Sequence, residues 1–255
     1  MDWTLLRELT DANRQRLLQH AIRRRFDRGD IVFREGESGD TLYLIREGRV
    51  AVRASTPMGD VATFAVLGPD EFFGEQAMMR PGQPRTATIV ALEPLEALTL
   101  QRAAFEQIRR AHPSVERFLT EVVATQVRRL SAHLLEALFL PAEQRVARRL
   151  IALGHQYQHA ATTRAPETPR MGVRSAAASS APPLSSEPIT IPLTQEDLAS
   201  LAGTTRPTVN RVLREMQTEQ AIRLRRGRIE LVDLHAIHRR AVHPSRTFAP
   251  PPDST

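Results

Sequence analysis

The chain has 255 residues, of which 41% are apolar, enough for one large or two ordinary domains with a packed core. Lysine and arginine number 35 against 29 acidic residues, and the net charge of +6 is compatible with nucleic acid binding. The absence of cysteine excludes disulfides, thiolate nucleophiles and cysteine-ligated metal centres. No apolar run approaches about 18 residues and no charged-then-apolar leader is present, so we expect neither a membrane span nor secretion, and a cytoplasmic location.

The first 25 residues are expected to be helical. Leucines from Leu5 to Leu18 recur on one apolar face, and Thr10 or Asp11 can cap a second helix. The basic run at residues 23–25 is interpreted as the polar end of that helix.

Between residues 26 and 100 the pattern changes to short strands separated by glycine-containing turns about every ten residues. Many short strands with regular turns predict an antiparallel barrel or jelly roll. The expected strands cover residues 31–33, 41–45, 50–52, 61–66, 87–91 and 95–100.

One segment, residues 72–90, interrupts this rhythm. Gly74 precedes a short helical turn expected at residues 75–79, and backbone N–H groups at such a turn favour an anion. Arg85 lies beyond a loop and can fold back as a charged fork, while Thr86 offers a hydroxyl. On chemistry alone, a structural turn and an anion site fit this segment equally well.

Residues 101–140 are predicted to be helical again, with a short helix at 102–110 and a long one from Pro113 to about residue 140. Apolar side chains at spacings of three and four make a coiled-coil stripe, which favours a dimer seam over one-sided packing on the barrel. The stripe consists of Leu119, Val123, Val127, Leu130, Leu134 and Leu138.

The segment after Pro141, which we interpret as a hinge, opens with a helix expected at residues 142–157. Residues 159–188 are rich in Ala, Ser, Thr and Pro, and are interpreted as a flexible insertion, either a neutral surface excursion or a partner-binding segment. His155 and His159 are four apart, but two histidines alone make a weak metal pattern, so we expect them to be exposed.

Residues 193–217 predict two short helices with a tight break between them. Thr194 and Asp197 form a capping-box pattern, and Gly203 can end the first helix. Thr205 can cap the second helix, with Pro207 in its first turn. The second helix has an apolar face and a basic, polar outer face, which is the helix-turn-helix pattern, although a plain packing hairpin has a similar pattern.

A basic hairpin is expected at residues 221–233, around Arg226-Gly227, and it completes a winged helix. The guanidinium of an arginine can donate two parallel hydrogen bonds to guanine or to phosphate. We expect Arg206 and Arg211 to contact guanine, and the hairpin to hold phosphates. The expected DNA-contacting residues are Thr205, Arg206, Thr208, Asn210, Arg211, Arg225, Arg226 and Arg228.

These motifs together resemble a known family. The resemblance rests on Phe33-x2-Gly36-Glu37, Gly39-Asp40, the apolar run at 42–45, Gly48, Phe73-Gly74-Glu75 and Arg85-Thr86-Ala87. They look like the cyclic-nucleotide-binding jelly roll, and with the winged helix they resemble the CRP/FNR family of bacterial transcription regulators across nearly the whole chain. The resemblance implies an α+β fold with a jelly-roll sensor domain at 1–112 and a dimerisation helix at 113–140. A winged helix-turn-helix domain at 141–242 carries the insertion at 159–188, and a disordered tail follows at 243–255.

The resemblance also implies a site and partners. Gly74 and Thr86, with Ala87 beside them, hold the cyclic phosphate, Arg85 pairs with its charge, and Glu75 takes the ribose 2′-hydroxyl. The effector is cAMP or cGMP, acting as a ligand and not as a catalytic cofactor, and no metal is expected. The implied partners are double-stranded promoter DNA, a second copy of the chain and RNA polymerase, but no membrane.

Three positions depart from the best-known family pattern. The base-contacting Thr-Ser pair of the cyclic-AMP-responsive members becomes Leu130-Ser131, and Leu130 can neither donate nor accept a hydrogen bond. Thr86 stands in place of Ser and points to cGMP as a second candidate. In the second helix of the helix-turn-helix, Pro207 replaces a Glu that accepts a hydrogen bond from cytosine, so the family's usual half-site is not expected.

Three alternatives stay open at this point. The same dimer can bind DNA without a nucleotide or sense another signal. A cyclic-nucleotide module can instead regulate a protein partner, with the winged domain as an interaction surface. An enzyme is disfavoured, because the sequence has no supported Ser-His-Asp arrangement, no P-loop and no paired carboxylates in a recognisable cleft.

Overall fold

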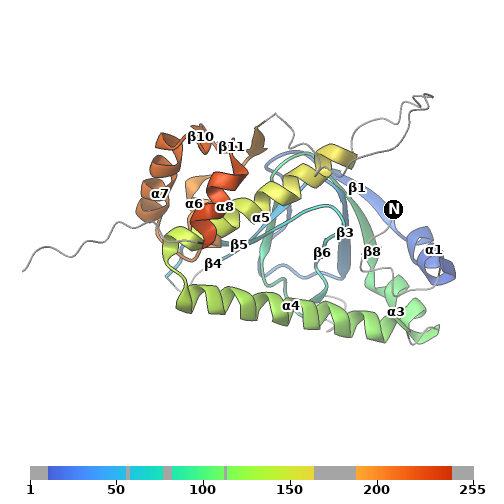
Figure 1. Cartoon of the computed structure of the whole chain (residues 1–255). Helices are drawn as coiled ribbons and strands as arrows, with labels where there is room; N and C mark the ends of the chain where they lie inside the picture. Colours follow the sequence, from blue (N-terminus) through green and yellow to red (C-terminus); the bar gives the residue numbers. More distant parts are fainter. Residues whose placement is uncertain (1–10, 56–57, 77–81, 112–113, 164–187, 243–255) are drawn as a thin grey trace, which may run out of the picture.

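The computed structural model describes residues 11–55, 58–76, 82–111, 114–163 and 188–242. In these residues a β barrel and a small helical domain are joined by two long helices (Figure 1). The expectations for residues 1–10 and the tail at 243–255 lie outside the described residues, as does most of the turn expected at 75–79.

The barrel is a jelly roll made of two four-stranded antiparallel sheets, which confirms the predicted fold class. The first sheet has the order β1 (Ile22–Phe26), β8 (Leu95–Gln101), β3 (Thr41–Glu47), β6 (Phe72–Phe73). The second has the order β2 (Ile31–Phe33), β7 (Thr88–Ala91), β4 (Val50–Ser55), β5 (Val61–Leu67). Apolar side chains on the inner faces bury themselves between the sheets, and Ile45, Val50 and Ala97 are fully enclosed.

The prediction for residues 23–25 was wrong, because they lie in strand β1 and not at a helix end. Helix α1 (Asp11–Gln19) ends before them, and β1 pairs antiparallel with β8. In a strand, alternate side chains share a face, so Arg23 and Arg25 both reach the buried carboxylate of Glu96. Burial alone would raise the pKa of Glu96, but the hydrogen bonds from these arginines outweigh it and lower the pKa.

Three helices follow the barrel: α3 (Arg102–Ala111), α4 (Ser114–Phe139) and α5 (Ala142–Thr163). The break between α4 and α5 falls at residues 140–141, where the sequence predicted a hinge. Helix α5 continues six residues beyond its predicted end at 157, so the expectation of a loop from residue 159 was wrong at its start. His155 is exposed, as expected, and residues 164–187 lie outside the described residues.

One guanidinium braces the hinge. The Nη1 of Arg145 donates to the carbonyl of Leu140 at 2.7 Å, just after α4. Its Nε donates to the carbonyl of Ala202 at 2.8 Å and its Nη2 to that of Gly203 at 2.9 Å, at the end of the first helix of the helix-turn-helix. A single side chain therefore binds carbonyls from both places.

The C-terminal domain is a winged helix-turn-helix. Helices α6 (Gln195–Leu201) and α7 (Arg206–Thr218) are followed by strands β10 (Ile222–Arg225) and β11 (Arg228–Leu231) and by helix α8 (Leu234–Val242). Strand β9 (Ile189–Ile191) pairs with β11 to complete a three-stranded sheet. The inward residues of α7, namely Val209, Val212, Leu213 and Met216, are fully buried as predicted.

The predicted caps differ in outcome. The capping box of Thr194 and Asp197 is present in both directions, and Gly203 adopts φ +58° after α6. Thr205 does occupy the N-cap of α7, but its side chain caps no backbone group. Its hydroxyl instead lies 3.0 Å from that of Thr208.

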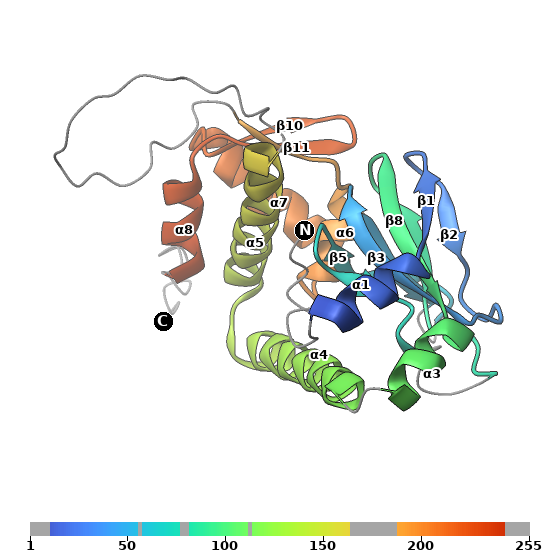
Figure 2. The ribbon, with the colours of Figure 1, turned by 90° about the vertical axis from the view of Figure 1, so that its right-hand side faces the viewer.

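The barrel and the winged domain share one apolar core. Ala51, Val66 and Leu92 of the barrel are buried in the same cluster as the interior of the winged domain. Helix α6 lies beside strand β5 of the barrel in both views (Figures 1 and 2). No sequence pattern indicated this contact between the domains.

Candidate functional site

A cavity of about 600 Å³ lies between the barrel and α4. It brings together Gly74, Glu75, Arg85, Thr86 and Ala87 with the middle of the long helix. The barrel contributes Gly74, Glu75, Arg85, Thr86 and Ala87, with Phe33 and Phe73 among the apolar walls, and α4 contributes Gln126, Arg129, Leu130 and His133.

Arg85 is the charged centre of this cavity. Its side chain is 8% exposed, and its guanidinium carbon lies 4.1 Å from the centre of the Phe33 ring. The Nη2 donates to the carbonyl of Thr41 at 2.9 Å and the Nη1 to that of Gly74 at 3.2 Å. The packing on the ring and these two bonds fix the direction of the guanidinium.

Two glycines make room for this guanidinium. A Cβ on Gly39 would lie 2.1 Å from the Nε of Arg85, and a Cβ on Gly74 would lie 2.7 Å from its Nη1. Gly74 also has φ +80°, which other residues rarely adopt. Gly39 and Gly74, which belong to two predicted motifs, thus both leave space for the side chain of Arg85.

The residues present fit a cyclic phosphate. The Nε of Arg85 is buried and has no hydrogen-bond acceptor among the described residues, and its other donors are shared with neutral carbonyls. An anionic oxygen is a better acceptor for such a fork. Thr86 lines the same cavity with its hydroxyl-bearing side chain.

Glu75 is half-buried beside this charge. Burial raises the pKa of its carboxyl, and the positive charge of Arg85 works in the opposite direction. A carboxylate here can accept hydrogen bonds from hydroxyl groups, which suits the predicted contact with a ribose.

The α4 wall contains residues that the sequence did not single out. Leu130 lines the cavity, whereas Ser131 is exposed and is not part of the lining. Gln126, Arg129 and His133 supply polar groups, and their i, i+3, i+7 spacing beside the apolar stripe was the available signal. Burial lowers the pKa of His133, and the charges of Arg149 and Arg129 act in the same direction.

The predicted DNA-contacting residues lie on two elements of the winged domain. On α7, Arg206 and Arg211 are exposed, and Thr208 and Asn210 are half-buried. Arg211 forms an ion pair with Glu215 at 2.9 Å, one helical turn away. The outer face of α7 is therefore polar, basic and accessible.

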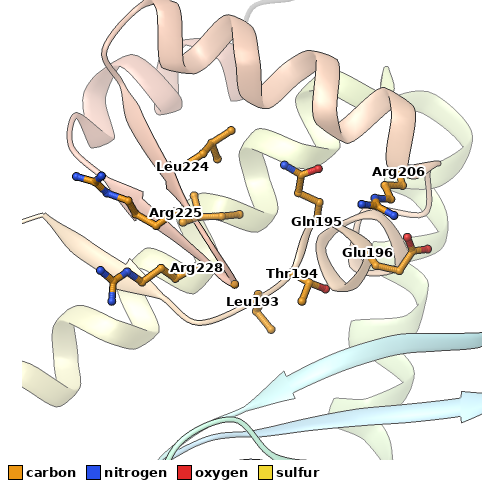
Figure 3. A pocket seen from close by; sticks show the side chains of 10 residues that line it. Leu193, Thr194, Gln195, Glu196, Arg206, Leu224, Arg225 and Arg228 are labelled. Atoms are coloured by element: carbon orange, nitrogen blue, oxygen red, sulfur yellow. The ribbon is translucent and has the colours of Figure 1, made fainter.

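A second cavity of about 420 Å³ joins α7 to the hairpin (Figure 3). Arg225 and Arg228 line one side of it, and Arg206 and the first turn of α6 line the other. Arg226 is exposed at the hairpin tip but is not part of this lining. Gln195, the first residue of α6, also lines the cavity and was not predicted.

Metal clusters and membrane-spanning helices are both missing from the part of the chain that the structure describes. It contains no group of three or more His, Asp or Glu side chains placed to hold a metal ion. Its helices include none that combines the length and the apolar character needed to cross a membrane.

Comparison with known proteins agrees with this architecture. Residues 23–112 match the cyclic nucleotide-binding domain, and residues 144–240 match the Crp-like helix-turn-helix domain. A CRP-like cAMP-activated global transcriptional regulator of Mycobacterium tuberculosis is 31% identical over 216 residues, covering 85% of this chain and 86% of that protein. The chain belongs to the CRP/FNR family.

Other CRP/FNR proteins are similar over most of their length. The cyclic AMP receptor protein of Thermus thermophilus is 31% identical over 214 residues, covering 84% of this chain and 85% of that protein. The crystal structure of a CRP-family transcriptional regulator from the same organism has a TM-score of 0.63 at 24% identity, covering 86% of this chain and 97% of that one. CRP/FNR proteins are transcription regulators, which agrees with the regulatory function predicted from the sequence.

Proposed function

We propose that this CRP/FNR regulator is a homodimer whose binding of promoter DNA is controlled by a cyclic nucleotide in the barrel. One observation carries the proposal. The cavity around Arg85 has barrel residues on one side and α4 on the other, and α4 leads directly to the hinge and the winged domain. A ligand in this cavity touches both the sensor and the connecting helix.

In the proposed complex the phosphate binds at the Arg85 end of the cavity. Arg85 pairs with its charge, Gly74 and Ala87 allow the backbone to approach, and the hydroxyl of Thr86 donates to it. Glu75 accepts a hydrogen bond from the ribose 2′-hydroxyl. The relatives named above as cAMP-activated or as a cyclic AMP receptor support a cyclic nucleotide as the effector.

The base is proposed to lie against α4. Leu130 gives this wall an apolar contact, while Gln126, Arg129 and His133 offer the hydrogen-bonding groups that Leu130 lacks. Ser131 is exposed, so we propose that it approaches a nucleotide bound to the second copy of the chain. Both cAMP and cGMP are candidates for this pocket.

Control of DNA binding by the nucleotide requires that the nucleotide has different affinities for two arrangements of the molecule. A nucleotide shifts the equilibrium only if it binds the DNA-competent arrangement more tightly. In that arrangement the two recognition helices of the dimer are about 34 Å apart and enter successive major grooves. Arg206 and Arg211 read guanine, Thr205, Thr208 and Asn210 make lesser contacts, and Arg225, Arg226 and Arg228 bind phosphates.

Calorimetry with cAMP and with cGMP tests the sensor. We expect one of them to bind, and Arg85→Ala to weaken that binding by about 30-fold or more, because the substitution leaves a buried anion unpaired. Arg25→Ala is the matched control, since Arg25 lies on β1, outside the cavity lining. Absence of heat with both nucleotides, together with unchanged DNA affinity in gel shifts, would reject nucleotide control.

A pair of arginine variants tests the DNA-binding surface. Arg211→Ala is expected to cost about 1–3 kcal/mol and to relax the preference at one base position, because it removes a base contact. Arg226→Ala is the comparison, and it should weaken binding to all sequences about equally, because a phosphate contact carries no sequence information. Selection from random duplexes measures both, and a uniform loss for Arg211→Ala would argue against base readout there.

A further inference from the structure

The α4 wall of the cavity around Arg85 has three polar side chains, and they differ in the hydrogen bonds that they can make. Gln126, Arg129 and His133 line the cavity from this helix. The amide of Gln126 has both donors and an acceptor. Burial lowers the pKa of His133, which favours the neutral ring with one donor and one acceptor. Of the three, only Arg129 is a donor without an acceptor.

The rest of the cavity lining divides into a polar segment and an apolar wall. Two further polar side chains, Gln76 and Gln83, belong to the same segment as Gly74 and Arg85, where the phosphate is proposed to bind. The apolar wall suits the rings of a planar base. On the barrel side this wall includes Val52, Phe64, Leu67 and Ile89.

A carboxylate of the barrel positions Arg129 at the α4 wall. The Nη1 of Arg129 lies 3.7 Å from the Oε1 of Glu71. The other oxygen of Glu71 accepts a hydrogen bond from the backbone N–H of Gly68 at 2.8 Å, which fixes the carboxylate. The side chains of Arg129 and Glu71 are 33% and 36% exposed, and an ion pair of this length and exposure is weak. The contact therefore directs the guanidinium and leaves its donors available to a ligand.

Guanine and adenine differ at the edge that carries N7. Guanine has two acceptors there, O6 and N7, and an arginine can donate to both. Adenine has an amino group in place of O6, and this group and a guanidinium are both donors, so they cannot pair. The amide of Gln126 suits adenine instead. A hydrogen bond from a charged donor is roughly twice as strong as one between neutral groups, so the preference of Arg129 outweighs that of Gln126.

We propose that Arg129 selects the base and that the cavity binds cGMP in preference to cAMP. The guanidinium donates to O6 and N7 of guanine. Leu130, beside it on α4, offers no acceptor to the amino group of adenine. This inference rests on the proposed control by a cyclic nucleotide and adds which nucleotide it is.

A series of nucleotides tests which edge of the base is bound. Calorimetry on the full-length wild type compares cGMP, cAMP and the hypoxanthine analogue cIMP, which share the same cyclic phosphate and ribose. The base of cIMP keeps O6 and N7 but lacks the 2-amino group of guanine. We expect cGMP and cIMP to bind about tenfold or more tightly than cAMP, the effect of one forked pair with the correct base.

Two variants separate the fork of Arg129 from its charge. Arg129→Gln removes the charge and supplies an amide, so the affinity ratio of cGMP to cAMP should fall to about one or below. Arg129→Lys keeps the charge but loses the planar fork, so the ratio should fall as well. The ratio does not respond to a general change in electrostatic attraction, because the two nucleotides have the same charge.

Arg128→Gln is the charge-matched control. Arg128 is exposed on α4, pairs with Glu121 at 3.5 Å and is not part of the cavity lining. Its substitution should leave the ratio of the two affinities at the wild-type value. Thermal unfolding shows whether each variant is folded, and Arg129→Lys and the wild-type series decide the matter if Arg129→Gln unfolds or binds neither nucleotide.

Equal affinities of the wild type for cGMP and cAMP, or a higher affinity for cAMP, would overturn the selection of guanine and leave nucleotide control intact. Binding of cIMP as weak as that of cAMP would show that O6 and N7 are not the atoms that are recognised, and would also overturn the proposal. A wild-type ratio in both Arg129 variants would remove Arg129 from this role. Absence of heat with all three nucleotides would reject nucleotide control together with this inference.

Discussion

At the scale of single residues, the position of Arg85 determines which residue types its neighbours can be. The guanidinium lies over Phe33 and between two carbonyls, and the space that it needs is provided by Gly39 and Gly74. These glycines belong to motifs that are far apart in the sequence. Their shared role is therefore to let one charge face the cavity.

Gly39→Ala separates ligand binding from stability. The new Cβ would lie 2.1 Å from the Nε of Arg85, and the guanidinium can yield because it is the end of a flexible side chain. We expect thermal stability close to that of the wild type but nucleotide affinity as low as that of Arg85→Ala. Gly68→Ala is the control, because its Cβ would make an ordinary contact of 3.6 Å with Arg49. Wild-type affinity in Gly39→Ala, measured by calorimetry, would contradict this role.

The sequence singled out most of the barrel side of the cavity but, on the α4 side, only Leu130. The spacing of Gly74, Arg85 and Thr86 around a loop was sufficient to bring them together, because short-range geometry constrains such a segment. The sequence did not indicate Gln126 and His133, because a helical stripe shows which residues are apolar but not which side of the stripe faces another domain.

At the scale of secondary-structure elements, α6 and α7 each have a threonine at the N-cap, but the two side chains have different roles. Thr194 caps α6 through its hydroxyl and forms a complete capping box with Asp197. Thr205 has the N-cap backbone conformation, but its hydroxyl contacts that of Thr208 instead. The two threonines therefore allow the contribution of a hydroxyl cap to stability to be compared at two helix N-termini of the same domain.

Thr194→Ala and Thr205→Ala are expected to differ in stability. Loss of the α6 cap should cost about 1 kcal/mol of unfolding free energy, because a backbone donor and Asp197 both lose a partner. Thr205→Ala should cost clearly less, because no backbone group depends on its hydroxyl. Urea unfolding of the full chain provides the comparison, and equal costs would show that hydroxyl caps do not distinguish these helices.

Local patterns were also misleading for two elements. Three arginines in a row are typical of the solvated end of a helix, yet they form β1 because alternate positions pair with Glu96 across the sheet. Helix α5 was predicted to end at the onset of an Ala- and Thr-rich composition, but it continues to Thr163. Amino-acid composition therefore locates the end of a helix less precisely than the backbone hydrogen bonds do.

At the scale of the whole molecule, α4 presents an apolar face that the described part of the chain leaves uncovered. Leu130 and Leu138 are each 66% exposed, Leu134 is 60% exposed and Val127 is 56% exposed. A contiguous apolar stripe of this kind is typical of an interface, and a twofold axis would let it pair with itself. The side chain of Leu119, also in the predicted stripe, lies outside the described residues.

Leu134→Glu is expected to convert the proposed dimer to a monomer, because it places a charge in the middle of the stripe. Ala132→Glu introduces the same charge at an exposed position of α4 outside the stripe, and should leave the dimer intact. Light scattering on the eluted protein gives the mass directly. A monomeric wild type, or a Leu134→Glu dimer, would reject α4 as the seam.

The packing of the winged domain on the barrel could not be predicted from the sequence. Arg53 and Thr63 lie on ordinary strands, and nothing in their neighbours indicates a partner as distant in the sequence as Asp197. Long-range contacts of this type depend on the relative placement of whole elements. Asp197 was predicted only as a helix cap, and its hydrogen bonds with Arg53 and Thr63 became visible in three dimensions.

The brace at Arg145 has a mechanical consequence. One guanidinium binds the carbonyl after α4 and two carbonyls at the end of α6, so hydrogen bonds link the pivot directly to the helix-turn-helix. Rotation about residues 140–141 then changes where α7 points without changing the shape that it presents. In the proposed function, sequence preference is encoded on α7 and effector response at the pivot. Under the proposed function, substitutions on α7 are expected to change the choice of promoter without altering the switch.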